Sequence, residues 1–273
     1  MENVRIDIKN NSNTNLIIDF HVHVFPDKVA EKAVESIGNY YGISMKRKGT
    51  VEDLFQSGSR AGISKYVVHS SATKVEQVAP INEYMYYLSK NFDNIISFGA
   101  IHPDIEDIGS AVDSIIKMGL KGIKLHPEFQ EFNIDDPKAM RIYEAIEGKL
   151  PVLIHMGDRF KDSSRPKRLS KVLDAFPNLE VIAAHLGGYS MWDEAEQYLI
   201  GRNLYLDTSS SLFFISSEKA ANIIRKHGAD KVLFGTDYPM WDHKEELQRF
   251  YDIGLVQWEN EMILRENALK LLG

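Results

Sequence analysis

Short apolar runs recur along this chain at a nearly constant interval, which limits its fold more than any other feature of the sequence. The runs are rich in β-branched and aliphatic residues, and after the first their starts lie roughly 25 to 30 residues apart. They are Leu16–Phe20, Tyr66–His69, Ile95–Ile101, Gly122–Leu125, Pro151–Ile154, Leu179–Ala183, Leu204–Leu206 and Val232–Phe234. Nearly continuous apolar character is typical of parallel strands that are covered on both faces. We therefore expect eight buried parallel strands.

Amphipathic helical patterns fill the intervals between these runs. Apolar residues recur at three- and four-residue spacing in Glu76–Lys90, Ile108–Met118, Pro137–Ile146, Ser217–His227 and Glu261–Leu272. Eight alternating strand and helix units predict an α/β fold, the (β/α)8 TIM barrel. The 273 residues are 44% hydrophobic and contain no Pro/Gly/Ser-rich linker between Leu16 and Leu272. We expect a single domain spanning residues 1–273.

Composition narrows the classes of partner. A formal net charge of -7 and a pI near 5.7 disfavour nucleic acid, whose phosphates require a basic surface. The absence of cysteine excludes disulfides and thiolate metal sites. No window approaches the ~18 consecutive apolar residues of a membrane span, and Met1 to Asn15 is polar rather than a hydrophobic export signal. We expect a cytoplasmic protein with a small-molecule substrate, and a homo-oligomer remains open.

Histidines gather where the apolar runs end, which is where the active sites of TIM barrels lie. Seven of the nine histidines are His21 and His23 on the first run and His69, His102, His126, His155 and His185 ending the second to sixth, while Asp237 follows the eighth. Side chains two apart on a strand share one face, so His21 and His23 can chelate one ion. A third histidine and a carboxylate would complete a catalytic shell for zinc or a similar divalent metal, and His155 and Asp237 are the candidates. A hydrogen-bonded structural role is the alternative for His69 and His102.

Six motifs, taken in order along nearly the whole chain, resemble a known family. They are Asp19-Phe20-His21-Val22-His23, Gly122-Ile123-Lys124-Leu125-His126-Pro127, Ile154-His155, Ala184-His185-Leu186-Gly187-Gly188, Phe234-Gly235-Thr236-Asp237-Tyr238-Pro239 and Asn267-Ala268-Leu269-Lys270-Leu271-Leu272. The sequence resembles the amidohydrolase superfamily, and more closely its metal-dependent hydrolase branch, which also contains aminocarboxymuconate-semialdehyde-type decarboxylases.

The resemblance implies a ligand set for one divalent ion, with zinc as the first choice: His21, His23, His155 and Asp237. It places His185 against the metal-bound water or the substrate. Two ions are the alternative, because binuclear members of the superfamily carry a bridging lysine carbamate or carboxylate on the fourth strand. In that case Lys124 would form the bridge and His185 would join His155 on the second ion. An ion pair between Lys124 and a neighbouring carboxylate such as Asp19, or contact of Lys124 with a substrate anion, would explain this lysine without a bridge.

The chemistry that follows is hydrolysis of a small carbonyl compound, such as an amide, ester or lactone that carries a carboxylate, by metal-activated water. In this hypothesis Asp237 takes a proton from the water and His185 stabilises the developing oxyanion. The runner-up is a non-oxidative decarboxylase of a small unsaturated or aromatic acid, with His185 as the acid/base. The third hypothesis is a catalytically inactive metal-binding barrel that serves as a binding protein.

Three residues are candidates for substrate binding. His126 lies two residues from Lys124, so both should point into the barrel. Arg159 follows His155 and could hold a carboxylate in a bidentate fork, or lie at the surface. Trp241 lies just beyond Asp237, where it would contact substrate or pack at the rim. The long segment Phe25–Gly62, which contains paired tyrosines, is expected to form a lid or wall over the pocket.

Overall fold

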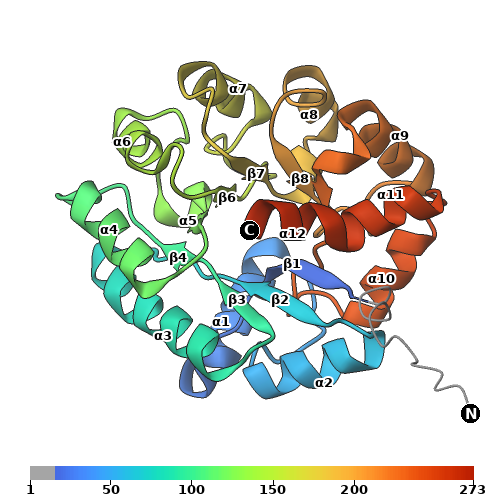
Figure 1. Cartoon of the computed structure of the whole chain (residues 1–273), viewed down its shortest axis with the longest axis horizontal. Helices are drawn as coiled ribbons and strands as arrows, with labels where there is room; N and C mark the ends of the chain where they lie inside the picture. Colours follow the sequence, from blue (N-terminus) through green and yellow to red (C-terminus); the bar gives the residue numbers. More distant parts are fainter. Residues whose placement is uncertain (1–15) are drawn as a thin grey trace, which may run out of the picture.

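Parallel strands form the centre of the computed structural model, and helices surround them (Figure 1). The structure describes residues 16–273, so the expectation for Met1 to Asn15 concerns residues outside that range. The strands are β1 Ile18–Val22, β2 Lys65–Val68, β3 Ile95–Ser97, β4 Gly99–Ala100, β5 Ile123–Leu125, β6 Val152–Ile154, β7 Val181–Ala183, β8 Tyr205–Asp207 and β9 Val232–Leu233. Every pairing between them is parallel, in the orders β1-β2-β3 and β4 through β9. The predicted TIM-barrel architecture is confirmed.

The helices follow the strands in turn. The longer ones are α1 Asp27–Tyr41, α2 Val51–Ala61, α3 Val78–Asn91, α4 Ile108–Met118, α6 Pro137–Ile146, α7 Pro166–Ala175, α8 Trp192–Tyr198, α9 Ser217–His227 and α10 His243–Tyr251. Shorter helical segments are η1 Val75–Gln77, α5 Pro127–Gln130, η2 His185–Gly187, η3 Ala229–Lys231, α11 Gln257–Glu261, η4 Met262–Glu266 and α12 Asn267–Leu272. Of the described helices, none combines the length and the apolar character that crossing a membrane requires.

The third predicted strand is divided in two, which is why residues 16–273 form nine strand segments instead of the expected eight. The Phe98 amide donates to the Val68 carbonyl of β2 at 2.9 Å, whereas the Gly99 amide donates to the Gly122 carbonyl beside β5 at 2.8 Å. Consecutive residues therefore pair with different neighbours, and the ladder breaks between them. The break in the ladder divides the strands into two sheets, although only Phe98 separates β3 from β4 along the chain.

Hydrogen bonds between β1 and the segment after β9 join the other seam of the ring. The Phe20 amide donates to the Phe234 carbonyl at 2.8 Å, and the Asp237 amide donates to the His21 carbonyl at 2.9 Å. Val22 and Tyr238 form an isolated parallel bridge. These bonds bring the first and last metal-ligand candidates of the sequence to adjacent backbone positions.

The final helical segment differs from the prediction of one continuous helix over Glu261–Leu272. The π-helical turn η4 separates α11 from α12. Within this turn the Ile263 carbonyl accepts a hydrogen bond from the Phe234 amide at 3.0 Å. This carbonyl therefore bonds to the segment after β9. A wider turn accommodates this external bond.

An inner apolar cluster fills one end of the barrel and leaves the other end for a site. Its buried members are Ile18, Phe20, Val67, Phe98, Leu153, Ile182, Ala184, Tyr205, Leu233 and Ala268. Because Ala268 belongs to α12, this helix closes the filled end, as its position across the centre of Figure 1 shows. The register of β1 on β2 shifts between Asp19 and Val22. Phe20 can therefore pack inward while the next residue, His21, faces the open end.

Candidate metal centre

A cavity of about 660 Å³ opens at the carboxyl ends of the strands. Its polar base consists of predicted site residues: His21, His23, Lys124, His126, His155, His185 and Asp237. Helix α1 contributes one wall through Val29, Ile37, Tyr40 and Tyr41. The long segment after the first strand thus forms a wall of the cavity, as expected from its length.

Three potential ligand atoms, from β1, the residue that follows it and the loop after β9, face one another. Oδ1 of Asp237 lies 3.3 Å from Nε2 of His23 and 3.6 Å from Nε2 of His21. Burial, and next the charge of Lys124, hold the pKa of His21 well below its usual value. Burial alone would raise the pKa of Asp237, but His21, His23 and His185 hold it well below its ordinary range. The group therefore consists of an ionised carboxylate and, at His21, a neutral imidazole.

The other ring nitrogen of each histidine is engaged elsewhere. Nδ1 of His21 lies 2.7 Å from Oδ2 of Asp207, and Nδ1 of His23 donates to the His69 carbonyl at 3.1 Å. Metal-ligating histidines commonly have a carboxylate or carbonyl on the second nitrogen, which fixes the tautomer and leaves the first nitrogen for the ion. The donor set of His21, His23 and Asp237 therefore fits a divalent cation.

Asp237 is oriented by a short hydrogen-bonded chain. Ser210 Oγ donates to Asp237 Oδ2 at 2.5 Å and accepts from Trp241 Nε1 at 3.0 Å. Ser210 and Asp237 have φ angles of 46° and 61°, in a region that such residues rarely adopt and that is often found at functional sites. The buried Trp241 is absent from the cavity lining and reaches the site through Ser210, so direct contact between Trp241 and substrate stays a prediction.

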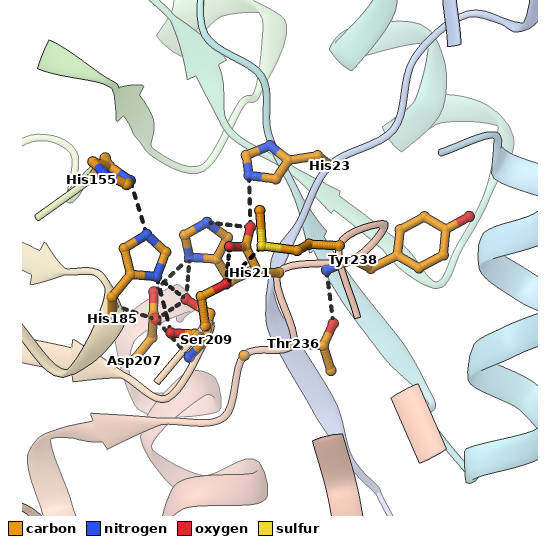
Figure 2. Close-up of polar contacts among 12 residues, drawn as sticks. His21, His23, His155, His185, Asp207, Ser209, Thr236 and Tyr238 are labelled. Atoms are coloured by element: carbon orange, nitrogen blue, oxygen red, sulfur yellow. Dashed lines mark hydrogen bonds and ion pairs between the residues drawn. The ribbon is translucent and has the colours of Figure 1, made fainter. Parts of the chain in front are cut away.

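His185 lies between His155 and the His21–Asp207 pair, as Figure 2 shows. Its Nε2 is 2.9 Å from Nδ1 of His155, and its Nδ1 is 2.9 Å from Ser209 Oγ. Burial lowers the pKa of His185, which favours the neutral imidazole. Within residues 16–273, no polar contact joins His155 to His21, His23 or Asp237, and the role of His155 as a ligand stays a prediction.

His69 lies close to the first two ligands, although the sequence placed it outside the ligand set. Its ring centroid is 4.6 Å from those of both His21 and His23, and the three offer ligand atoms within 4.8 Å of one another. The His69 ring is fully buried and neither of its nitrogens has a hydrogen-bond partner among the described residues. Its position at the end of the second apolar run was the sequence feature that indicated a place near the metal-ligand candidates.

Lys124 is buried beside His21, with Nζ 3.4 Å from Nε2 of that ring. Burial lowers the pKa of Lys124 to about 8. The alternative of an ion pair with Asp19 is wrong: the Asp19 carboxylate instead accepts from the backbone and hydroxyl of Thr236 and lies 3.3 Å from His243 Nε2. Carbamylation of Lys124 and its contact with a substrate anion both stay predictions.

A second polar group lies at the ends of β5 and β6. The His126 and His155 rings are stacked, with centroids 4.0 Å apart, and Tyr41 Oη lies 3.1 Å from His126 Nε2. Glu128 is 1% exposed, and burial raises its pKa to about 7. Glu128 was not predicted as a site residue, whereas Tyr41 is one of the paired tyrosines in the segment expected to cover the pocket. The signal for Glu128 was a carboxylate two residues after His126, whereas Tyr41 is brought in by tertiary packing of α1.

Arg159 lies at the surface rather than in the cavity lining. Its guanidinium lies over the rings of Tyr189 and Phe214, 5.5 and 5.4 Å from their centroids. Lys161, from the same loop, lines the cavity instead, and its Nζ donates to the Glu128 carbonyl at 2.9 Å. Substrate binding by Arg159 and His126 stays a prediction.

Comparison with known proteins relates nearly all of the described chain to one family. The sequence model of the family described as Amidohydrolase matches residues 18–273. A search of curated protein sequences finds no match. Among solved structures, 5-carboxyvanillate decarboxylase LigW from Sphingomonas paucimobilis is 16% identical with a TM-score of 0.72, covering 95% of this chain and 99% of that one.

Two further structures have similar coverage. A probable 2-pyrone-4,6-dicarboxylic acid hydrolase from Acinetobacter baumannii is 17% identical with a TM-score of 0.68, over 94% of this chain and 99% of that one. A dihydroxybenzoic acid decarboxylase from Polaromonas, with bound manganese and an inhibitor, is 14% identical with a TM-score of 0.70, over 95% and 97%. At these identities the likeness establishes the fold.

Proposed function

Because this chain belongs to the amidohydrolase family, we propose that it is a metal-dependent hydrolase of a small carbonyl compound that carries a carboxylate. The observation that carries this proposal is the convergence of three ligand atoms: Nε2 of His21, Nε2 of His23 and Oδ1 of Asp237. Three such ligands leave a further position for water or substrate on a catalytic ion. We propose zinc as the ion, with manganese as the alternative.

A bound divalent ion would supply an acidified water and would polarise the carbonyl oxygen of the substrate. The chain's own residues then move the protons. Asp237 is ionised, and Ser210 orients its carboxylate, so it can accept a proton from water and later return that proton to the leaving group. His185 presents a buried neutral imidazole to the same cavity, where it can stabilise negative charge that develops on the substrate oxygen.

An aromatic wall favours non-oxidative decarboxylation as the second candidate. Tyr40 packs edge-on against Tyr41 and Phe129, with ring centroids 4.9 Å apart in both pairs, and all three rings line the cavity. Aromatic faces of this kind suit a planar, conjugated acid. In that reaction His185 would serve as the acid/base at the substrate carbon, so both candidates use the same residues.

Parallel assays separate the two reactions. The zinc- and manganese-loaded protein is tested on carboxylated lactones and small amides, with acid release followed by titration, and on hydroxybenzoic and unsaturated acids, with released carbon dioxide measured. Turnover of lactones or amides without carbon dioxide supports hydrolysis, whereas carbon dioxide release supports decarboxylation. A metal-loaded protein that turns over neither class contradicts both and favours an inactive binding barrel.

A further inference from the structure

We propose that the chain holds a second divalent cation between Glu128, His126 and His155, apart from the group formed by His21, His23 and Asp237. The three side chains offer one oxygen and two nitrogens that all lie within 4.8 Å of one another, and all three side chains are buried. The proposal concerns cation binding and does not depend on which reaction the cavity supports.

Two buried polar atoms of this group lack a partner among the described residues. Glu128 Oε2 and His126 Nδ1 have no hydrogen bond, although Glu128 is 1% and His126 is 7% exposed. A polar atom buried without a partner is costly, and more so when it belongs to a carboxylate. Oε2 lies 3.6 Å from His126 Nδ1 and 4.0 Å from His155 Nε2, both beyond a good hydrogen bond. The two orphaned atoms therefore face a common point without bonding to each other.

These separations are close to those between ligands of one ion. Nitrogen and oxygen ligands about 2.0 to 2.2 Å from zinc in a tetrahedral shell lie about 3.4 Å from one another. Two imidazoles and a carboxylate suit zinc, manganese and similar borderline cations. A cation at this point would satisfy both orphaned atoms together after shifts of a few tenths of an ångström.

The remaining atoms of the group are held as ligands require. Glu128 Oε1 accepts from the backbone amide and the hydroxyl of Ser164, at 2.9 and 2.5 Å. His126 Nε2 faces Tyr41 Oη at 3.1 Å, which leaves Nδ1 as the free nitrogen. His155 Nε2 donates to the Gly157 carbonyl at 2.9 Å, and the cation would replace this hydrogen bond. Fixed second atoms of this kind orient metal ligands.

The proposed position differs from a lysine-bridged binuclear site. It uses Glu128 from the short helix α5 after β5 in place of Lys124, and it does not involve His185. His155 turns Nδ1 toward His185 and Nε2 toward Glu128, so it is available to the second cation while His21, His23 and Asp237 hold the first. The second cation would add positive charge to the wall that Tyr41 covers, where a substrate carboxylate could bind.

Zinc stoichiometry tests the proposal on the full chain. Metal-free protein is titrated with zinc by calorimetry, and bound zinc is counted by elemental analysis after dialysis. We expect about two equivalents per chain in the natural protein and about one in Glu128→Gln, whose lost site weakens by at least about 100-fold. Glu246→Gln is the matched control, because Glu246 is also 1% exposed with an unpartnered Oε2 but belongs to none of the ligand clusters. It should keep both equivalents.

A zinc-edge anomalous map of the natural protein gives a second readout that needs no variant. We expect a peak in bonding contact with Glu128 Oε2 and His126 Nδ1. Equal stoichiometry in the natural protein and Glu128→Gln, or a zinc-saturated map with density only beside His21 and His23, would overturn the second cation and leave the proposed function intact. Density only beside Glu128 would instead support this inference and contradict the proposed catalytic site.

Discussion

On the β1–β9 side of the cavity, Asp237 has one oxygen held by Ser210 and the other facing His21 and His23. On the β5–β6 side, Glu128 has one oxygen held by Ser164 and the other without a hydrogen-bond partner among the described residues. Both carboxylates are buried, but their pKa values move in opposite directions: that of Asp237 falls, and that of Glu128 rises to about 7.

The difference shows how one cavity can combine a preformed centre with an adaptable wall. Around Asp237, nearby histidines offset the cost of burying the charge, so the carboxylate remains ionised without help from a ligand. Around Glu128, burial dominates, and the ionised form needs an added cation to become stable. We therefore expect chemistry to depend mainly on the first side, and metal-linked stability and substrate preference on the second.

The largest effect should follow Asp237→Asn, which preserves shape but removes the base. We expect the kcat/KM of the zinc-loaded enzyme to fall by about 10²- to 10⁴-fold. Steady-state kinetics on the substrate class identified above provide the measurement, and Asp174→Asn, an exposed carboxylate paired with Arg202, is the control. Full activity in Asp237→Asn would remove the basis for treating the β1–β9 side as the catalytic one.

Glu128→Gln should show the cost of the unpartnered carboxylate in metal-free protein. Since burial raises the pKa of Glu128 from 4.5 to about 7, its stabilising contribution is present below about pH 4.5 and is lost as the pH rises through 7. Near pH 8 the variant should be more stable than the natural protein by up to about 3 kcal/mol, and near pH 4 the two should agree. Urea unfolding in chelator measures both free energies.

Adding zinc distinguishes a buried carboxylate that binds the cation from one that is only buried. Burial also raises the pKa of Glu246 to about 7, so Glu246→Gln should give a similar pH trend. Saturating zinc should remove the advantage of Glu128→Gln and leave that of Glu246→Gln unchanged. A pH-independent difference between the natural protein and Glu128→Gln would contradict the contrast between the two carboxylates.

Asp207→Asn tests the support behind the first ligand. The Asp207 carboxylate lies 2.7 Å from His21 Nδ1 and accepts from the His185 amide at 3.0 Å. Loss of such an outer partner should weaken zinc binding by about 10- to 100-fold. Competition with a chelator measures the affinity, and circular dichroism establishes that the barrel remains folded. Unchanged zinc affinity in a folded variant would mean that the orientation of His21 by Asp207 contributes little to zinc binding.

The smallest change is expected for Tyr41→Phe. It removes the hydroxyl that faces His126 Nε2, a contact of about 1 kcal/mol, and should raise KM several-fold with little change in kcat. Tyr40→Phe is a matched control, because its hydroxyl donates to Asp158 at 3.2 Å rather than to a histidine. Equal effects of the two substitutions would assign the wall a packing role only.

The sequence predicted the barrel and the metal-ligand candidates from local patterns. The length and spacing of the apolar runs located the strands. Because the active sites of TIM barrels lie where the strands end, the sequence also predicted that His21, His23 and Asp237 lie together, without any knowledge of contacts. The register shift between β1 and β2 that lets both Phe20 and His21 face the interior of the barrel could not be predicted, because it depends on how the two strands pair.

Residues whose role depends on long-range packing were harder to assign. Asp207 and Ser209 contact His21 although they are far from it in the sequence, and Tyr41 reaches His126 only because α1 folds over the cavity. Loop residues were the least predictable: Arg159 follows a ligand candidate in sequence, but its exposed side chain lies over the rings of Tyr189 and Phe214 and does not line the cavity. Sequence distance from a ligand does not determine which way a loop side chain turns.

The most direct test of the catalytic centre is the metal content of the purified protein beside that of the double variant His21→Asn/His23→Asn, each after incubation with zinc and dialysis. The natural protein should retain at least one equivalent, and the double variant should lose about one equivalent together with all turnover. Equal metal content in the two proteins, or no bound metal in the natural one, would contradict the assignment of His21, His23 and Asp237 as the metal centre.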